Sequence, residues 1–339
     1  MGSEAKKRVF SGIQPSGDLH IGNYLGAIKG WVEHQSDKEN FFCIVDLHSI
    51  TVAQDPDTLR DQTRSAVALL FASGLDPSLC SVFIQSQVST HAECCWILNC
   101  ITPLGWLERM TQFKDKAGDQ ASVSTGLLDY PVLMAADIIL YSAHEVPVGD
   151  DQRQHVELAR DIAQRFNHLY GETFVVPEAV IPEAGARVMG LNDPNSKMSK
   201  SYADVRGHAV GMLDEPKEIE RSIKRAVTDS HGEIIFSDDA ERSGVNNLLG
   251  IYKAVTNKTK SEVEKDFSDA RGYGDLKTRV AEVLIEELNP IRDRYQELIK
   301  DGNQLDELLA RGADRAASIS VPKLQEVKSK VGLVLSGGP

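Results

Sequence analysis

The chain has 339 residues, 41% of them hydrophobic and 26% charged, which is typical of a soluble globular protein with room for two domains. Its formal net charge of −13 argues against indiscriminate nucleic-acid binding, which needs a basic surface. No run approaches the roughly 20 apolar residues that span a bilayer, and the start MGSEAKKRVF lacks the apolar core of a secretory signal. We therefore expect a cytoplasmic protein without a membrane partner.

Strand-like and helix-like segments alternate over roughly the first 190 residues. Short apolar runs predict strands at 9–13, 41–47, 81–86 and 144–149, and apolar residues at helical spacing predict helices at 22–35, 55–75, 91–100, 125–141 and 150–166. The helix from 55 has clear ends, with Asp55 as N-cap, Pro56 at the first helical position and Gly74 as a stop. This alternation predicts an α/β fold, a doubly wound parallel sheet with helices on both faces.

After Pro194 the pattern becomes mainly helical. Apolar residues spaced three and four apart predict helices at 213–227, 246–255, 277–299 and 306–319. One run, EIIF at 233–236, has the character of a strand. We therefore expect an α-helical second domain.

Five cysteines lie in the first hundred residues, at 43, 80, 94, 95 and 100. The stretch HAECCWILNC has histidine and cysteine at close spacing, but it lacks the paired C-x-x-C that would complete a tetrahedral zinc site. Reduced and mostly buried thiols are the favoured interpretation, and we expect no metal site in the protein itself.

The segment GIQPSGDLHIGN, residues 12–23, follows the first predicted strand. In an open parallel sheet ligands bind at the carboxyl ends of strands, where helix N-termini offer N–H groups to an anion. His20 and Asn23 are three residues apart and can reach the same phosphate from the opening turn. A plain strand–turn–helix connection would account for the glycines equally well.

The segment NSKMSKS, residues 195–201, contains two lysines three residues apart. Lys197 and Lys200 are mobile point charges suited to a pyrophosphate group, on a loop that could close over a nucleotide. The alternative is a solvated basic loop.

Asp137 lies in the apolar run MAADIIL, on the same helical face as Tyr130 and Met134. A carboxylate in such surroundings is unfavourable unless it is paired. From the residues alone, it either pairs with an internal group or accepts a hydrogen bond from a ligand.

Together these motifs resemble a known family. HIGN at 20–23 is similar to the HIGH signature of class I aminoacyl-tRNA synthetases, and KMSKS at 197–201 is identical to their second signature. GIQPSG, FCIVDLHSIT, ERMTQFKDK, YPVLMAADIILY, VPVGDDQ, AVTDS and GVNNLLGIY, in this order, resemble the bacterial-type tryptophanyl-tRNA synthetases over nearly the whole chain. Asn23 replaces the last histidine of HIGH, an exchange that looks normal in this branch.

The resemblance implies a Rossmann-like catalytic domain at 1–191, with helices from 296–339 packing back on it. It also implies a KMSKS loop and helical anticodon-binding domain at 192–295. The implied activity joins L-tryptophan to tRNA(Trp) through tryptophanyl-adenylate, with ATP and Mg²⁺ and no organic cofactor. Family members are homodimers.

The resemblance also implies roles for individual residues. His20, Asn23, Lys197 and Lys200 would stabilise the reacting phosphates. ATP would contact Gln14, Pro15, Ser16, Gly22, Asn23, Lys116, Gly149, Asp150, Asp151, Val188, Lys197, Met198, Ser199, Lys200 and Ser201. Asp137 would accept the indole N–H, and the rest of the tryptophan site would be Phe10, His48, Tyr130, Met134, Val146, Val148 and Gln152.

Several of these roles compete with structural ones. Phe10, Met134, Val146 and Val148 would serve equally as core, and His48 beside a strand is often structural. Asp150 could be a helix N-cap, and Lys114 and Lys116 could lie on a surface loop.

Three other functions fit parts of the pattern. A tyrosyl-tRNA synthetase shares both signatures, but it would need a hydroxyl-bearing residue where this chain has Phe10. A small-molecule adenylyltransferase would not need the long helical second half. A non-catalytic tRNA-binding paralogue would be expected to have lost a signature lysine or Asp137, and this chain retains them.

Overall fold

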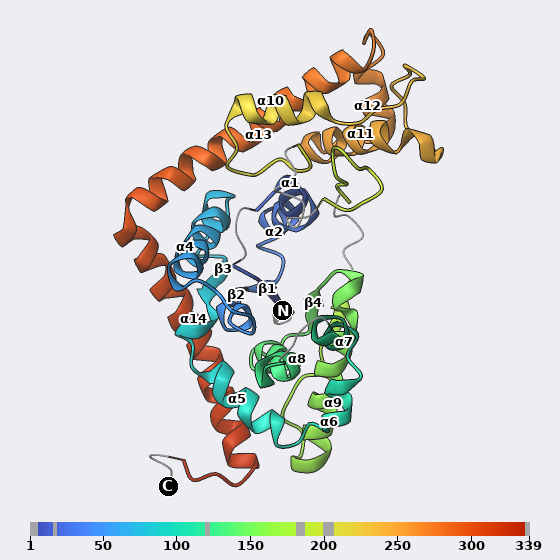
Figure 1. Cartoon of the computed structure of the whole chain (residues 1–339). Helices are drawn as coiled ribbons and strands as arrows, with labels where there is room; N and C mark the ends of the chain where they lie inside the picture. The colour runs from blue at the N-terminus through green and yellow to red at the C-terminus, as the bar shows by residue number, and fades with distance from the viewer. Residues whose placement is uncertain (1–5, 16–18, 119–122, 181–186, 199–206, 336–339) are drawn as a thin grey trace, which may run out of the picture.

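A computed structural model of the chain describes residues 6–15, 19–118, 123–180, 187–198 and 207–335, except for the side chains of 115–118 and 150. Figure 1 shows a part built around a central sheet and a helical part made mainly of later residues. The two long helices α13 (Tyr273–Lys300) and α14 (Gly302–Lys330) follow one another along one side of the molecule. Helix α13 runs beside the helical part, and α14 runs beside the part with the sheet.

Five parallel strands form one sheet in the order β3-β2-β1-β4-β5. They are β1 (Arg8–Ile13), β2 (Glu39–Ile44), β3 (Cys80–Ile84), β4 (Glu145–Pro147) and β5 (Glu178–Val180). The order runs outward from β1 in both directions, so the predicted doubly wound α/β fold is confirmed. The strand β1 pairs with β2 along its whole length but with β4 only between Val9 and Glu145. The topological switch point, where ligands are expected to bind, is therefore beside β1.

Helices follow the strands in the first half of the chain. They are α1 (Ile21–Asn23), a π-helical turn η1 (Tyr24–Ile28), α2 (Lys29–Glu33), α3 (Asp46–Ser49), α4 (Pro56–Ala72), η2 (Gln85–Gln87), α5 (Thr90–Asn99), α6 (Leu104–Glu108), α7 (Thr111–Gly118), α8 (Thr125–Ile139), η3 (Asp150–Gln152) and α9 (Arg153–Tyr170). The predicted cap of α4 is confirmed, because the Asp55 carboxylate accepts the Thr58 N–H at 2.8 Å. Gly74, just beyond the helix, has a φ of 113°, a left-handed conformation that glycine adopts readily.

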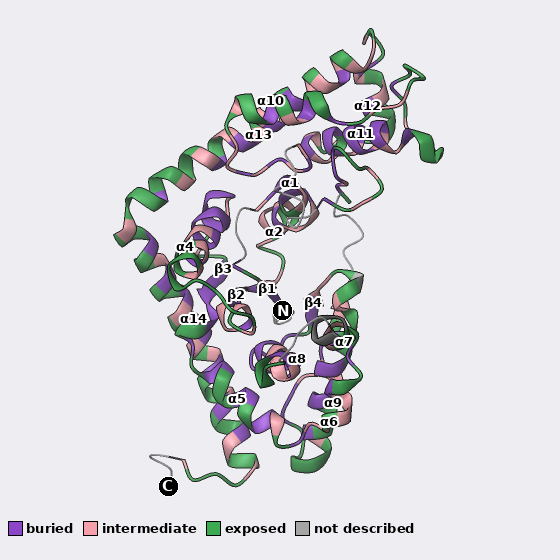
Figure 2. Cartoon of the chain, viewed as in Figure 1, coloured by how far each residue is buried: buried purple, intermediate pink, exposed green. Residues whose placement is uncertain are grey.

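Both faces of the sheet are buried. Phe42 and Ile44 of β2 point to a hydrophobic cluster that contains the buried face of α4. Phe41 and Cys43, which alternate with them, point to a second cluster that contains α5, α8 and α9. Figure 2 shows the buried residues of these helices on the sides that face inward. This is the side-chain alternation of a parallel strand covered on both faces.

Several predicted boundaries need correction. The strand predicted at 41–47 ends at Ile44, and Asp46 to Ser49 form α3. The strand predicted at 81–86 ends at Ile84. Helix α9 begins at Arg153 with Gln152 in the N-cap position, three residues later than the helix predicted from 150.

The strand predicted at 233–236 is also wrong, because this segment is irregular and the fifth strand is instead β5. The backbone of the segment is hydrogen-bonded by side chains: Arg242 binds the Glu233 carbonyl, and the Phe236 N–H donates to Glu264. The short edge strand β5 lies between two prolines and gave no clear apolar run.

The second half is helical, as predicted. Its helices before α13 and α14 are α10 (Pro216–Arg225), η5 (Ala240–Arg242), α11 (Ser243–Thr256) and α12 (Lys260–Asp266). Helix α13 packs on α10, α11 and α4, and α14 packs on β3 and α5. One hydrophobic cluster contains residues from both sides of the boundary predicted near residue 191. The division into two domains stays a prediction.

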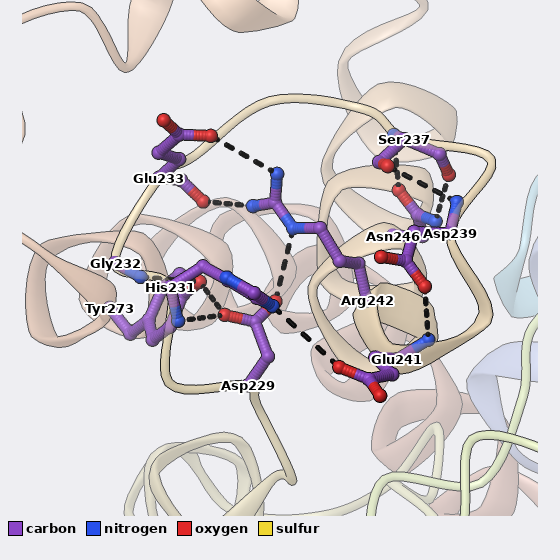
Figure 3. A network of polar contacts seen from close by, with 10 residues as sticks. All are labelled: Asp229, His231, Gly232, Glu233, Ser237, Asp239, Glu241, Arg242, Asn246 and Tyr273. Atoms are coloured by element: carbon purple, nitrogen blue, oxygen red, sulfur yellow. Dashed lines mark hydrogen bonds and ion pairs between the residues drawn. The ribbon is translucent and has the colours of Figure 1, made fainter.

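A network of polar side chains links the loops of the helical part (Figure 3). The Arg242 guanidinium and the Asp229 carboxylate lie 3.1 Å apart, with exposed side-chain fractions of 6% and 5%. Tyr273 of α13 donates to Asp229, and Arg242 also faces Glu233. These contacts satisfy the hydrogen-bonding groups of the two buried charges, which fixes the loop between α10 and α11 against α13.

All five cysteines are free thiols, and four of them are buried, as expected. Burial raises the pKa of Cys80 and Cys95 to about 12, so these thiols stay protonated at neutral pH. In the described part of the chain, no helix combines the length and the apolar character needed to cross a membrane.

Candidate active site

The HIGN motif forms the turn between β1 and the following helix. His20 is the N-cap of α1, and its Nδ1 accepts the Gly22 N–H at 3.1 Å. The Asn23 Oδ1 in turn accepts the His20 N–H at 3.1 Å. Because Nδ1 is an acceptor, a neutral His20 ring carries its hydrogen on Nε2, where it can be donated to a phosphate oxygen. The two residues share one turn as expected, but part of the role of Asn23 is to hold His20.

The start of KMSKS reaches the same turn. Lys197 forms an antiparallel bridge with Met189, and the Met198 N–H donates to the Val188 carbonyl at 3.1 Å. An added Cβ on Gly22 would lie 3.6 Å from Met198 Cβ and about 2.8 Å from the His20 ring. A side chain at position 22 would therefore collide with the His20 ring, beside Met198 of the second signature.

A segment that follows the KMSKS motif also forms backbone hydrogen bonds with the HIGN turn. The Ile21 N–H donates to the Val210 carbonyl at 2.9 Å, and the Met212 N–H donates to the Leu19 carbonyl at 2.8 Å. The segment that follows the KMSKS motif thus pairs with the chain on both sides of His20. Backbone pairing of this kind leaves no side-chain pattern, so the sequence did not indicate it.

Some predicted ATP contacts lie outside the described residues. These are Ser16, Ser199, Lys200 and Ser201, together with the side chains of Lys116 and Asp150. Their roles stay predictions.

Several of the other predicted contacts lie just after the carboxyl ends of β1 and β4. Gln14 is exposed and Pro15 buried just after β1. Gly149 and Asp151 are exposed after β4, and the Gln152 amide donates to Asp151 at 3.0 Å. Lys114 and Lys197 are exposed, whereas Val188 and Met198 are buried.

Asp137 of α8 is 1% exposed and is surrounded by hydrogen-bond donors. Oδ1 accepts from Gln85 Nε2 and His91 Nδ1, both at 2.7 Å, and Oδ2 accepts from His48 Nε2 at 2.8 Å. Of the two roles considered for Asp137, internal pairing is therefore present. Each carboxylate oxygen can accept two hydrogen bonds, so Oδ2 retains capacity for one more among the described contacts.

These contacts keep Asp137 ionised. Burial by itself would raise the pKa of the carboxyl, but hydrogen bonds from His48 and His91 outweigh it and lower the pKa below its ordinary value of 3.8. A negative charge is thus held in an apolar region by three side chains.

The residues around Asp137 follow the carboxyl ends of neighbouring strands. His48 lies on α3 directly after β2, and Gln85 begins η2 directly after β3. The HIGN turn follows β1. Since carboxyl ends of parallel strands share one edge of the sheet, two of the donors to Asp137 lie at the edge from which the chain leaves β1 toward the HIGN turn.

The four apolar residues predicted to face the indole occur in one cluster. Phe10 and Val146 are buried core residues, and Met134 and Val148 pack against the same cluster half-buried. Phe10 stacks on Tyr141 with ring centroids 5.4 Å apart. Core packing is therefore shown for all four, and contact with an indole stays a prediction.

Tyr130 is half-buried next to His48, with their rings 6.2 Å apart and edge to face. Its hydroxyl lies 2.8 Å from His155 Nε2 and 3.3 Å from the Gln112 Oε1. Burial raises the pKa of Tyr130 to about 12, so it is a neutral phenol at physiological pH.

Gln85, His91 and His155 were missed by sequence reasoning. His91 was visible only as a doubtful zinc ligand, and both of its ring nitrogens are engaged, by Asp137 and by the Tyr141 hydroxyl. Gln85 lay inside a segment predicted as strand. A polar residue directly after a buried strand was the one signal that could have found it.

One group of side chains has the spacing of metal ligands. In the described ranges, His231, Asp239 and Glu241 have ligand atoms within 4.8 Å of one another, and all three are exposed. They lie on the loops of Figure 3, in the helical part of the chain. They are not part of the site at the strand ends.

Comparison with known proteins agrees with this geometry. A family model described as "tRNA synthetases class I (W and Y)" matches residues 3–289. The chain belongs to this class I tRNA synthetase family.

Similarity to individual proteins extends over nearly the whole length. A tryptophan–tRNA ligase from Caldanaerobacter subterraneus subsp. tengcongensis is 52% identical over 329 residues, which are 97% of this chain and 99% of the relative. The structure of a Campylobacter jejuni tryptophanyl-tRNA synthetase complexed with ADP and tryptophan has a TM-score of 0.84 and 37% identity, covering 96% of this chain and all 100% of that one. The enzyme from Mycoplasma pneumoniae has a TM-score of 0.86 and 34% identity, covering 97% and 98%.

The resemblance to bacterial-type tryptophanyl-tRNA synthetases is therefore confirmed. These synthetases are related to this chain at 34–52% identity, which favours the tryptophan branch over the tyrosyl alternative.

Proposed function

We propose that this chain is a tryptophan–tRNA ligase. The tryptophan carboxylate attacks the α-phosphorus of ATP, forming tryptophanyl-adenylate and releasing pyrophosphate. The terminal ribose of tRNA(Trp) then takes the aminoacyl group and releases AMP. The observation that carries this proposal is the buried Asp137 carboxylate, held by donors that directly follow the carboxyl ends of β2 and β3.

Recognition of the indole depends on Asp137. The remaining lone pair of Oδ2 accepts the indole N–H, while His48 and Gln85 hold the carboxylate in place. Phe10, Met134, Val146 and Val148 supply the apolar wall, which a flat aromatic ligand requires. The polar groups of Tyr130, Gln14 and Gln152 orient the ammonium and carboxylate of the amino acid.

Catalysis consists of positioning and electrostatic stabilisation, since the transfer needs no enzyme nucleophile. His20 donates from Nε2 to a phosphate oxygen, and Asn23 fixes the turn that presents it. Lys197 and Lys200 neutralise the charge that develops on the pyrophosphate. Gly22 and Gly149 have no side chain, so the nucleotide can approach the main chain there. Asp150 and Asp151 accept hydrogen bonds from the ribose hydroxyls. Val188 packs against the adenine.

The reaction would use Mg²⁺ supplied with the nucleotide, whose phosphate oxygens would be its main ligands. In the part of the chain that the structure describes, the strand-end site has no group of three His, Cys, Asp or Glu ligands. The functional unit is a cytoplasmic homodimer that binds tRNA(Trp). Support for these points comes from the family resemblance.

The proposal is tested by ATP–pyrophosphate exchange with purified protein, supplied separately with tryptophan, tyrosine and a tryptophan analogue whose ring N–H is replaced by sulfur. We expect exchange with tryptophan and a kcat/KM for the analogue lower by about 10⁴-fold or more, because a site built around a hydrogen bond rejects a ligand without the donor. Asp137→Ala should abolish most exchange. Removing Mg²⁺ with a chelator should stop it.

Asp129→Asn is a matched control, because Asp129 lies on the same helix with its carboxylate bound by the Asn99 amide. It should retain wild-type exchange. Exchange driven by tyrosine, or equal rates with tryptophan and the sulfur analogue, would refute the role given to Asp137. Lack of exchange with every amino acid would refute the activity.

A further inference from the structure

The polar contacts of Asp137 continue through the core to Tyr141, and the residue next to His91 bonds the C-terminal helix. His91 of α5 lies between the Asp137 carboxylate and the Tyr141 hydroxyl, with Nε2 2.8 Å from that hydroxyl. Thr90, which precedes His91 on α5, donates from Oγ1 to Ser320 Oγ of α14 at 2.9 Å. Of these side chains, Thr90 is 5% exposed, Asp137 1%, and the other three 0%.

The ionised carboxylate fixes the direction of the first hydrogen bond. It only accepts, so His91 Nδ1 carries the hydrogen and donates it to Asp137. In the neutral imidazole Nε2 is then an acceptor, which receives the Tyr141 O–H. Both donors then point toward the carboxylate.

Such a chain strengthens its last hydrogen bond, because each donor polarises the next in a medium of low dielectric constant. Tyr141 is suited to transmit this effect, since burial raises its pKa and keeps the hydroxyl protonated. Its ring is held by Phe10, Phe41 and Phe83, at centroid distances of 5.4, 4.9 and 5.6 Å. The hydroxyl thus has a fixed position relative to His91.

We propose that His91, Tyr141 and Ser320 are positioning residues for tryptophan recognition. They act through Asp137: the chain fixes Oδ1 so that Oδ2 keeps the orientation needed to accept the ligand N–H. Ser320 of α14 acts through Thr90, the residue next to His91 on α5. This inference rests on the proposed function and adds residues to which that function assigned no role.

The test compares Tyr141→Phe and Ser320→Ala with wild-type enzyme in ATP–pyrophosphate exchange. Tyr141→Phe removes only the hydroxyl and keeps the ring packing. We expect it to raise the KM for tryptophan about tenfold, the effect of one net hydrogen bond, with the KM for ATP changed less than about twofold. Its preference for tryptophan over the sulfur analogue should fall by a similar factor. Ser320→Ala should change both quantities in the same direction by a smaller factor.

Ser81→Ala is a matched control for Ser320→Ala. Ser81 lies on β3, is 1% exposed, and its hydroxyl has no hydrogen-bond partner among the described residues. This variant also loses a buried hydroxyl, but it should keep the wild-type KM for tryptophan. His91→Gln, which retains an N–H donor, should be closer to wild type than His91→Ala.

The possible outcomes separate the two proposals. Wild-type exchange with tryptophan, together with unchanged tryptophan KM in folded Tyr141→Phe and Ser320→Ala, would overturn the positioning role and leave the proposed function standing. Equal changes in the KM for tryptophan and for ATP would mean that these residues contribute only to stability. This result would also overturn the positioning role. Absence of exchange in the wild type would overturn the proposed function itself.

Discussion

At the scale of single residues, Asp137 shows how a buried charge becomes tolerable. The sequence placed a carboxylate in an apolar helix and left its partners open. The structure supplies three donors, from segments that follow β2 and β3 and from α5. Because these donors hold the charged form, the carboxylate can serve as an acceptor at neutral pH instead of becoming protonated.

Asp137 should also make folding stability depend on acid pH. Its pKa is lower in the folded chain than the ordinary value of 3.8, so its ionised form stabilises the fold. This contribution is fully present above the unfolded pKa near 3.8 and is lost as the pH falls through the lower folded pKa. We expect Asp137→Asn to be less stable at pH 7 by about 1–3 kcal/mol. Its unfolding free energy should also fall less steeply below about pH 4 than that of the wild type.

Denaturant unfolding at a series of pH values, followed by circular dichroism, would measure both effects. Parallel stability profiles for wild type and Asp137→Asn across the acid range would contradict the assigned hydrogen bonding.

At the scale of elements, α14 depends on one glycine for its approach to the sheet. A Cβ added to Gly312 would lie 1.8 Å from the Val82 carbonyl oxygen on β3. Gly312→Ala must therefore displace the helix, and we expect a loss of about 1–3 kcal/mol in the free energy of unfolding, measured with urea. Since α14 carries Ser320, the Gly312→Ala variant should also have a higher KM for tryptophan.

Gly250→Ala is the control for this substitution. Gly250 lies within α11, and an added Cβ would meet nothing within 4 Å. Alanine is the better helix former, so this variant should be as stable as the wild type or more stable by up to about 1 kcal/mol. Equal stability of Gly312→Ala and wild type would show that the close packing of α14 on β3 is wrong.

At the scale of the whole molecule, the helical part depends on a buried ion pair. Arg242 and Asp229 hold the loops of Figure 3 against α13, the helix that also packs on α4 beside the sheet. Arg242→Met removes one partner and leaves the other charge buried, so we expect a loss of about 3–5 kcal/mol in the free energy of unfolding. Arg60→Met, which breaks an exposed pair with Asp57, should have little effect.

Thermal unfolding of both variants by calorimetry would test this expectation. A change in Arg242→Met no larger than that in Arg60→Met would mean that the pair does not stabilise the helical part.

The fold class and most helices could be predicted because they depend on local patterns. Period-three and period-four apolar spacing indicated α4, α8, α9, α10, α11, α13 and α14, and the Asp55 cap was visible directly. Prediction failed where distant groups decide the local structure. EIIF resembles a strand, but Arg242 and Glu264 bind its backbone, whereas β5 is a strand only because β4 lies beside it.

The sequence by itself determined the family, the α/β order of segments and the two signature motifs, since each is a pattern of neighbouring residues. Only the tertiary structure decided which groups meet. It placed Met198 against Gly22, surrounded Asp137 with donors from three segments, and linked Asp137 through His91 to Tyr141. The physical reason is that hydrogen bonds between distant segments need a fixed geometry, which the packing of the sheet and its helices provides and which residue spacing along the chain does not encode.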